Sequence, residues 1–257
     1  MLSLSQIDDT YCQGIEFNVT DIDNLARTIA FVLIQEYDLA RRLVTGDDHP
    51  TDVISLENDD IEDIIQRRLH PKDVYHRDGF LFQLMMWLAA HLDLQDGDLV
   101  ALPHSQGSAK GQDSIVVHRS TDSVVALSIC EDKATENPEH TVQYKVWPEI
   151  KEYEQGGRRD ELRSNIIATL GTAGISSAEA QNLIRGISWT GKRRYRVRVT
   201  VEPNQRTSKL FKGFEEIVNG DNEMRRGETT TLPSMRSWMT TLAEKIENEL
   251  RSFARGI

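Results

Sequence analysis

Hydrophobic positions recur every three or four residues over several stretches of the chain, which is the spacing of amphipathic helices. The first stretch runs from Thr20 or Asp21 to about Leu43, and the second from Asp59 or Asp60 to Leu69. A third helix, Asp78–Leu94, is apolar nearly all round. Helices of that kind are usually buried, so we expect this one in the core.

Apolar runs in the middle of the chain predict three strands. They are Leu99–Leu102, Asp113–His118 and Ser123–Lys133. The last contains the almost unbroken apolar run VVALSIC, which is typical of a strand covered on both faces. A turn at Thr121-Asp122 then makes the second and third strands a hairpin.

The C-terminal half predicts more helices and one further strand. Lys192–Glu202 is its most strand-like stretch, because arginines alternate there with tyrosine and valines. Residues 1–19 are expected to be irregular or strand-like. The expected helices cover about Pro148–Gln155, Asp160–Leu170, Ser177–Ile184 and Ser234–Phe253.

The composition narrows the class of protein. Of 257 residues, 39% are hydrophobic and 28% are charged, with a net charge of −11, which excludes collagen-like, low-complexity and wholly disordered chains. The two cysteines cannot form a disulfide framework. No targeting segment is visible, and no apolar stretch approaches the roughly 20 residues that span a bilayer. We therefore expect a cytoplasmic protein.

Charge is distributed unevenly along the chain. Residues 1–70 contain 15 acidic and 5 basic residues, whereas residues 185–236 contain 12 basic and 6 acidic ones. An acidic protein can still bind nucleic acid when its positive charge gathers on one face. The alternative is that these are solvated surface charges.

The most informative polar residues lie on the predicted hairpin. Side chains alternate along a strand, so Glu131 and Lys133 project from one face and Asp132 from the other. Asp113 opens the preceding strand and can lie beside Glu131. Two carboxylates and one ammonium would then meet at one edge of a sheet. Acidic oxygens are the ligands that Mg²⁺ prefers, and such an ion can assist phosphodiester cleavage.

An aspartate followed downstream by Glu-x-Lys on a paired strand resembles the PD-(D/E)XK nuclease superfamily. The similarity covers about residues 78–145, roughly a quarter of the chain, and includes the helix start DGFLFQ at 78–83. The most similar groups are nucleases of bacterial antiviral systems: the Hachiman-type nuclease and the nuclease domain of nucleotide-activated effectors. These residues do not distinguish the two.

The resemblance implies an α/β fold with a restriction-endonuclease-like α-β-β-β-α-β core and helical additions at both ends. It implies that Asp113 and Glu131 hold Mg²⁺, with Mn²⁺ as the alternative ion, and that Lys133 positions the attacking water. Gln83 would support the metal ligands from behind or contact the ion through a water molecule. Many members have glutamate at that position, and an amide adds no charge.

Basic residues outside the hairpin are candidates for contacts with the phosphate backbone. Arg194, Arg196 and Arg198 share one face of their strand, and Lys110 lies in the loop before Asp113. The alternative for the arginines is an exposed sheet face with ion pairs across strands, and for Lys110 simple solvation.

These observations predict a DNA endonuclease, with residues 1–75 as an acidic helical layer and residues 76–257 as the nuclease-like core. We expect DNA as the substrate, and a helicase-like or sensor protein of a prokaryotic defence system as a partner. A homo-oligomer is also considered. A non-catalytic subunit that binds nucleic acid or a helicase is the alternative from another class, and RNA cleavage is a third.

Overall fold

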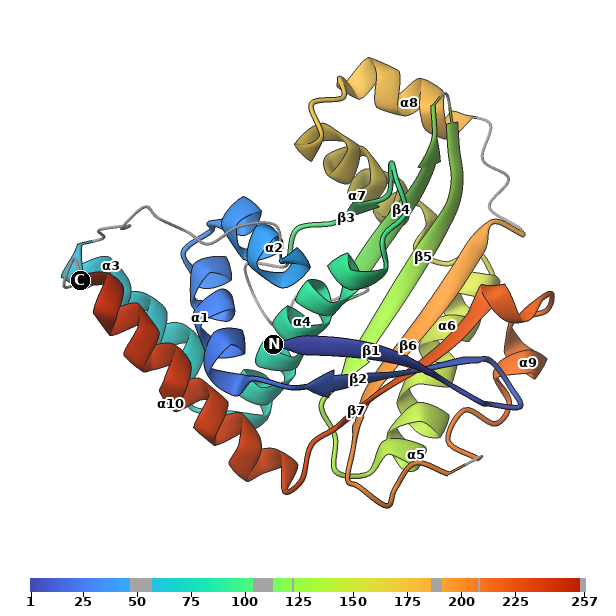
Figure 1. Cartoon of the computed structure of the whole chain (residues 1–257). Coiled ribbons are helices and arrows are strands. Elements are labelled where there is room, and N and C mark those ends of the chain that lie inside the picture. Colours follow the sequence, from blue (N-terminus) through green and yellow to red (C-terminus); the bar gives the residue numbers. More distant parts are fainter. Residues whose placement is uncertain (47–56, 104–112, 122, 186–190, 208, 255–257) are drawn as a thin grey trace.

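The computed structural model of the protein describes residues 1–46, 57–103, 113–121, 123–185, 191–207 and 209–254. Helices cover both faces of a seven-stranded mixed β-sheet (Figure 1), so the predicted α/β class is confirmed. The strands lie in the order β1-β2-β7-β6-β5-β4-β3. Their bounds are β1 Leu2–Ile7, β2 Gln13–Val19, β3 Leu99–Val100, β4 Ser114–Ser120, β5 Ser123–Lys133, β6 Arg193–Val201 and β7 Arg225–Thr231.

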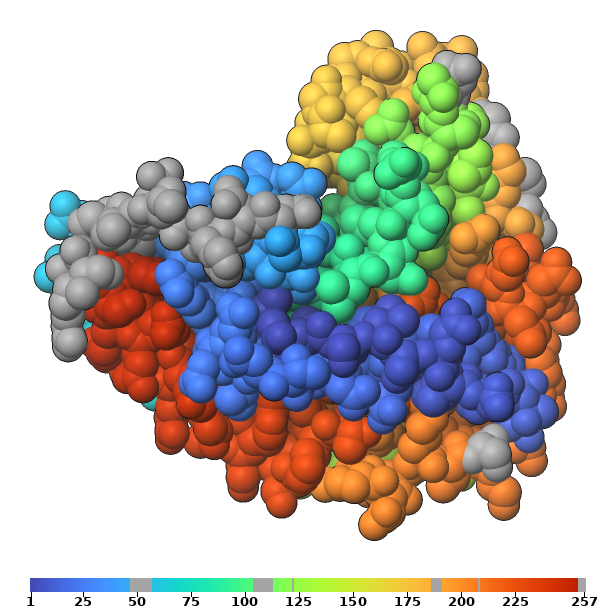
Figure 2. Space-filling view, viewed as in Figure 1, coloured from blue at the N-terminus to red at the C-terminus, as the bar shows by residue number. Residues whose placement is uncertain are grey.

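The middle of the sheet is parallel and its two margins are antiparallel. Strands β2, β7, β6 and β5 run parallel to one another. At one margin β1 is antiparallel to β2, and at the other β4 is antiparallel to both β5 and β3. β1 lies at the surface (Figure 2), with its residues alternating between exposed and half-buried for most of its length. Residues 1–19 therefore extend the same sheet that contains the predicted hairpin.

One layer of helices packs on the first face of the sheet around a hydrophobic core that includes Leu81, Met85, Ile29 and Leu242. Its members are α1 Ile22–Leu33, α2 Tyr37–Thr45, α3 Asn58–Ile64 with a π-helical turn at Ile65–Leu69, α4 Val74–Ala90 with a 3₁₀ turn at His91–Asp93, and α10 Met235–Ala254. No helix in the described part of the chain is both long and apolar enough to cross a membrane.

A second layer covers the opposite face around a core that includes Ile129, Ile150, Val197 and Phe214. Its members are α5 Pro138–Thr141 with a π-helical turn at Val142–Val146, α6 Trp147–Glu154, α7 Arg159–Thr172, α8 Ser177–Arg185 and α9 Phe214–Ile217. A 3₁₀ turn at Asn222–Met224 precedes β7. The sheet therefore presents its two faces to two separate cores.

Two helix predictions were wrong in detail. The helix expected from Thr20 to Leu43 is divided at Gln35, which has a left-handed backbone (φ 67°), and α2 turns back to bury Leu39 and Ala40 in the core. The central helix begins at Val74, where the Asp73 side chain accepts a hydrogen bond from the Tyr75 N–H.

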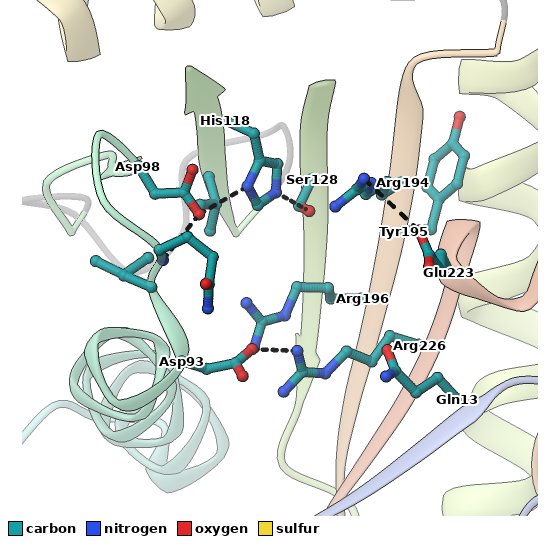
Figure 3. A pocket seen from close by; sticks show the side chains of 13 residues that line it. Gln13, Asp93, Asp98, His118, Ser128, Arg194, Tyr195, Arg196, Glu223 and Arg226 are labelled. Atoms are coloured by element: carbon teal, nitrogen blue, oxygen red, sulfur yellow. Dashed lines mark hydrogen bonds and ion pairs between the residues drawn. The ribbon is translucent and has the colours of Figure 1, made fainter. Parts of the chain in front are cut away.

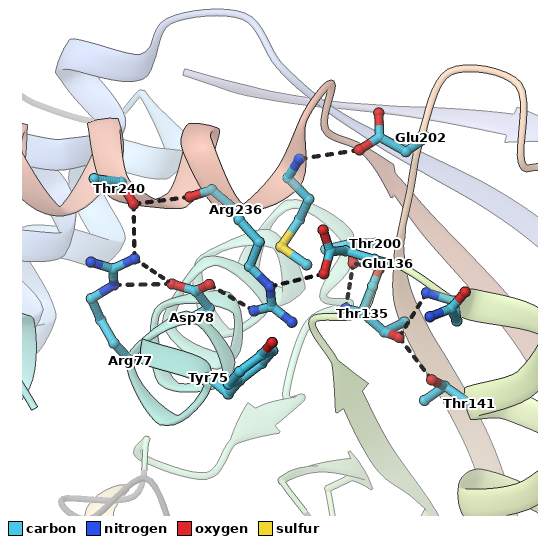
Figure 4. Close-up of polar contacts among 12 residues, drawn as sticks. Tyr75, Arg77, Asp78, Thr135, Glu136, Thr141, Thr200, Glu202, Arg236 and Thr240 are labelled. Atoms are coloured by element: carbon cyan, nitrogen blue, oxygen red, sulfur yellow. Dashed lines mark hydrogen bonds and ion pairs between the residues drawn. The ribbon is translucent and has the colours of Figure 1, made fainter. Parts of the chain in front are cut away.

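Asp78 is consequently an internal residue of α4, and it anchors α10 instead of capping a helix. Its carboxylate is fully buried. It accepts hydrogen bonds from Arg77 Nε at 3.0 Å and from Arg236 Nη1 at 2.7 Å (Figure 4). The Arg77 guanidinium also donates to Thr240 of α10. This network fixes α4 against the C-terminal helix.

Candidate active site

Three of the predicted site residues meet at the end of β5. Glu131 and Lys133 project toward α6, on the same face as Ile129. Asp113 directly precedes β4, and its N–H donates to the Cys130 carbonyl at 3.2 Å. Its carboxylate accepts a hydrogen bond of 2.6 Å from the Asp132 N–H. The hairpin register therefore places Asp113 beside Glu131, as the alternation of side chains predicted.

Lys133 connects the acidic side chains of this cluster. Its Nζ lies 3.1 Å from Glu131 Oε2, 3.7 Å from Asp113 Oδ2 and 3.4 Å from Glu149 Oε2. Three carboxylates around one ammonium give a net charge of −2 when all four groups are ionised. We call Asp113, Glu131, Lys133 and Glu149 the carboxylate cluster.

The negative charge and the burial of the cluster both act on its protonation. Burial and the neighbouring Asp113 carboxylate raise the pKa of Glu131 well above its ordinary value. Burial alone would lower the pKa of Lys133, but Glu131, Asp113 and Glu149 together raise it above its ordinary value. The neighbouring carboxylates therefore favour a bound proton on both kinds of group, whereas burial favours one only on Glu131.

Glu131 has an unused oxygen. The residue is 1% exposed, and its Oε1 is a buried acceptor without a hydrogen-bond donor among the described residues. A buried, unsatisfied carboxylate oxygen is destabilising, and this one lies beside a cluster of net negative charge. A hard cation would relieve both penalties, and Asp113 and Glu131 supply the oxygen ligands that such an ion prefers. These residues therefore fit the predicted Mg²⁺ in charge and donor type.

Metal ligation is not fully preformed in the side chains. Within the ranges that the structure describes, no group of three or more His, Cys, Asp or Glu side chains is arranged to hold a metal ion. The Lys133 ammonium lies within ion-pair distance of both predicted ligands. The ion would therefore share the carboxylates of Asp113 and Glu131 with Lys133.

Gln83 reaches the cluster from α4, on the other side of the sheet edge. Its Nε2 donates a short hydrogen bond to Asp113 Oδ1. The amide thereby orients the Asp113 carboxylate, whose second oxygen is held by the Asp132 N–H. The contact places Gln83 directly behind Asp113, and its predicted role in metal coordination stays a prediction.

Glu149 was not predicted. It lies in the first turn of α6, two residues after Trp147, which begins the helix. One turn later on the same helix, buried Tyr153 has its hydroxyl 3.1 Å from Arg158 Nη1, and burial raises the pKa of Tyr153. Residues four apart share one face of a helix, so the pair Glu149 and Tyr153 was visible in the sequence once α6 was placed over β5.

Arg194, Arg196 and Arg198 of β6 were expected to contact a phosphate backbone, but two of the three are buried in ion pairs across strands. Arg198 is 1% exposed and binds Asp132, with Nη2 at 2.9 Å from Oδ2. Arg196 is also buried, and its Nε lies 2.6 Å from Glu228 Oε1. Burial of this face beneath α4 leaves only Arg194 partly exposed. Lys110 lies outside the described residues.

Glutamine in place of Glu131 is expected to stabilise the fold by about 1 kcal/mol near pH 8, the usual gain when one unfavourable group is relieved. The pKa of Glu131 is raised in the folded state. When the pH rises above the ordinary pKa of glutamate, the unfolded chain therefore loses this proton before the folded protein does, and the wild type loses stability. The advantage of Glu131→Gln should therefore vanish at acidic pH and grow as pH rises. Urea unfolding from about pH 4 to pH 8 measures this difference.

Exposed Glu139 offers a control, because Glu139→Gln should change stability little at any pH. A wild type more stable than Glu131→Gln throughout the range would mean that Lys133 outweighs burial at this carboxylate.

No protein-family model matches the sequence, and neither does any curated protein.

Proposed function

We propose that the protein is a metal-dependent nuclease that hydrolyses DNA phosphodiester bonds. The observation that carries the proposal is the convergence of Asp113, Glu131 and Lys133 at the end of one strand, with a buried Glu131 oxygen that lacks a donor among the described residues. With all four groups ionised, the cluster has a net charge of −2 that suits a divalent cation, and a metal-dependent cleavage uses both the cation and a positioned water.

The order of elements supports the proposal of a restriction-endonuclease-like core. From α4 to β6 the chain passes through a helix, three antiparallel strands, helices that include α6, and a strand parallel to β5. This is the α-β-β-β-α-β order that the resemblance implies, with α7 and α8 inserted before the last strand. The carboxylate cluster lies at the carboxyl end of β5, between that strand and α6.

Each residue of the cluster then has a distinct role. Asp113 and Glu131 would hold Mg²⁺ or Mn²⁺, which when bound acidifies a water molecule and offsets charge on the phosphate. Lys133 orients the water and stabilises the developing negative charge. Gln83 keeps the Asp113 carboxylate aligned. Glu149 holds the Lys133 ammonium in the cluster when no substrate is present.

The proposal changes the expected contacts with DNA. Arg196 and Arg198 are buried, and Arg194 lies on the sheet face opposite Glu131, because it pairs with Ser128 in the register. The DNA backbone is therefore expected to approach from the α6 side. A role in prokaryotic antiviral defence, with a helicase-like or sensor partner, is proposed on the resemblance alone.

Cleavage of supercoiled plasmid tests the proposal. The wild type should nick or linearise DNA with Mg²⁺ or Mn²⁺ but not with EDTA, and Asp113→Asn should lower the rate by about 10²–10³-fold, since a cation contributes several kcal/mol to such a reaction. Asparagine preserves the shape of the side chain and its acceptor for the Asp132 N–H. Glu139→Gln is the matched control and should cleave like the wild type.

Equal cleavage by the wild type and Asp113→Asn would contradict the assignment. DNA binding without cleavage by either protein would favour the non-catalytic alternative. An RNA substrate of the same sequence, run in parallel, separates the two polymers: cleavage of RNA alone would overturn the choice of DNA.

A further inference from the structure

A second polar pocket lies on the α4 side of the sheet, away from the carboxylate cluster. Its volume is about 180 Å³, and strands β4 to β7 and the segment after α4 contribute its walls (Figure 3). Arg194, Arg196 and Arg226 line it together with Asp93 and His118. Because Arg196 pairs with Cys130 in the register, the pocket opens on the face opposite Glu131. The proposed nuclease chemistry uses none of these residues.

Buried guanidinium groups in this pocket have unused donors. Arg196 Nη2 and Arg226 Nη2 are both buried, and neither donates a hydrogen bond within the described part of the chain. Asp93 Oδ2 lies 3.9 Å from Arg196 Nη2, which is an ion pair beyond hydrogen-bond distance. Unsatisfied charged donors are strongly destabilising when buried. A ligand with several acceptor oxygens would satisfy them.

Two of the three acidic side chains that line the pocket, Asp93 and Glu223, are partly or largely exposed, whereas Asp98 is buried against His118. The Asp93 side chain is 31% exposed and binds Arg226 from the 3₁₀ turn after α4. The Glu223 side chain is 81% exposed and lies 4.0 Å from Arg194 Nη2. By contrast, Glu228 is fully buried beside Arg196. An incoming anion can therefore replace Asp93 and Glu223 at the pocket mouth while Glu228 stays in place.

The neutral groups of the pocket are already hydrogen-bonded. His118 lies between Asp98, at 2.8 Å from Nδ1, and Ser128, at 2.8 Å from Nε2. Burial lowers the pKa of His118, so the ring adds no positive charge to those of the arginines near neutral pH. The recognition of a ligand is left to the three arginines, whose planar forks match the tetrahedral oxygens of a phosphate in bidentate fashion.

We propose that this pocket binds the phosphate group of a small molecule, with Arg194, Arg196 and Arg226 as donors and Asp93 as the competing carboxylate. The pocket has room for one phosphate, and a larger molecule would extend out through the mouth beside Arg194.

Calorimetric titration with inorganic phosphate and with AMP, in EDTA, tests the proposal on the full chain. Arg194 is partly exposed, so Arg194→Gln should fold normally and bind about tenfold to 100-fold more weakly, the loss expected for a charged hydrogen-bond donor. Asp93→Asn removes the competitor and should bind several-fold more tightly. Equal affinity for the two ligands would mean that the protein recognises the phosphate alone. Tighter binding of AMP would mean that it also contacts the nucleoside.

Two controls separate this pocket from the carboxylate cluster. Lys133→Met removes the cation of the cluster, and Arg163→Gln removes an exposed arginine on α7; both should bind phosphate like the wild type. Loss of binding in Lys133→Met instead of Arg194→Gln would overturn the proposal, as would a wild type that binds neither ligand at about 10 mM. Because no step requires cleavage, the result is independent of the nuclease assignment.

Discussion

Replacing Lys133 with methionine is expected to lower the rate of Mg²⁺-dependent DNA cleavage by about 10²–10³-fold, the usual effect of removing one preorganised group that stabilises transition-state charge. Methionine retains much of the apolar length of the lysine but has no ammonium group to orient water or offset charge. Plasmid cleavage under single-turnover conditions measures the rate.

Binding of the metal should survive the same substitution. Removing the ammonium leaves Asp113 and Glu131 with no competitor for the ion, so Mg²⁺ should still stabilise the variant. At ten times Kd the stabilisation is about 1.4 kcal/mol, or about 3 °C in the melting temperature of a chain of this size. Lys151→Met, an exposed lysine on α6, is the control and should cleave normally. A Lys133→Met protein as active as the wild type would remove lysine from the mechanism.

Arg198→Met is expected to destabilise the protein by about 3–5 kcal/mol, because it leaves a buried carboxylate without its partner. Arg198 joins three elements: it binds Asp132 of β5 with two nitrogens and donates to the Met86 carbonyl of α4 at 3.0 Å. Urea unfolding measures the change in the free energy of unfolding.

The double variant Asp132→Asn/Arg198→Met should recover part of that loss, since no isolated charge remains. The deficit of Arg198→Met should also shrink as pH falls. Burial raises the pKa of Asp132 to about 7 even beside Arg198, so without the arginine the folded state takes up a proton more readily than the unfolded chain and gains stability toward acidic pH. Equal unfolding free energies for the double and single variants would contradict this account.

The hairpin could be predicted because its signals are local. The apolar run of β5 gave the correct bounds, Ser123–Lys133, and strand alternation alone placed Glu131 and Lys133 on one face. The position of Asp113 needed only the adjacent strand. Glu149 required the angle at which α6 crosses the sheet, which depends on packing between Ile150 and the strands, and no local pattern contains that information.

Strand β7 and the arginines of β6 show the opposite case. The sequence RRGETTT has little apolar character, yet β7 lies between β2 and β6, and its Glu228 forms an ion pair with Arg196. Alternating arginines look like a solvated face when one strand is considered alone. Their burial is compensated by acids from β5 and β7, which are 66 and 32 residues distant in the sequence.

Neighbouring carboxylates on β5 have opposite duties. Glu131 belongs to the proposed reaction centre on the α6 side, while Asp132 binds Arg198 on the α4 side. Sliding the strand by a single residue would exchange them: Asp132 would enter the carboxylate cluster and Glu131 would face Arg198. An insertion of one amino acid within β5 is therefore a more severe lesion than many substitutions, since it rewires both faces while leaving the composition almost untouched.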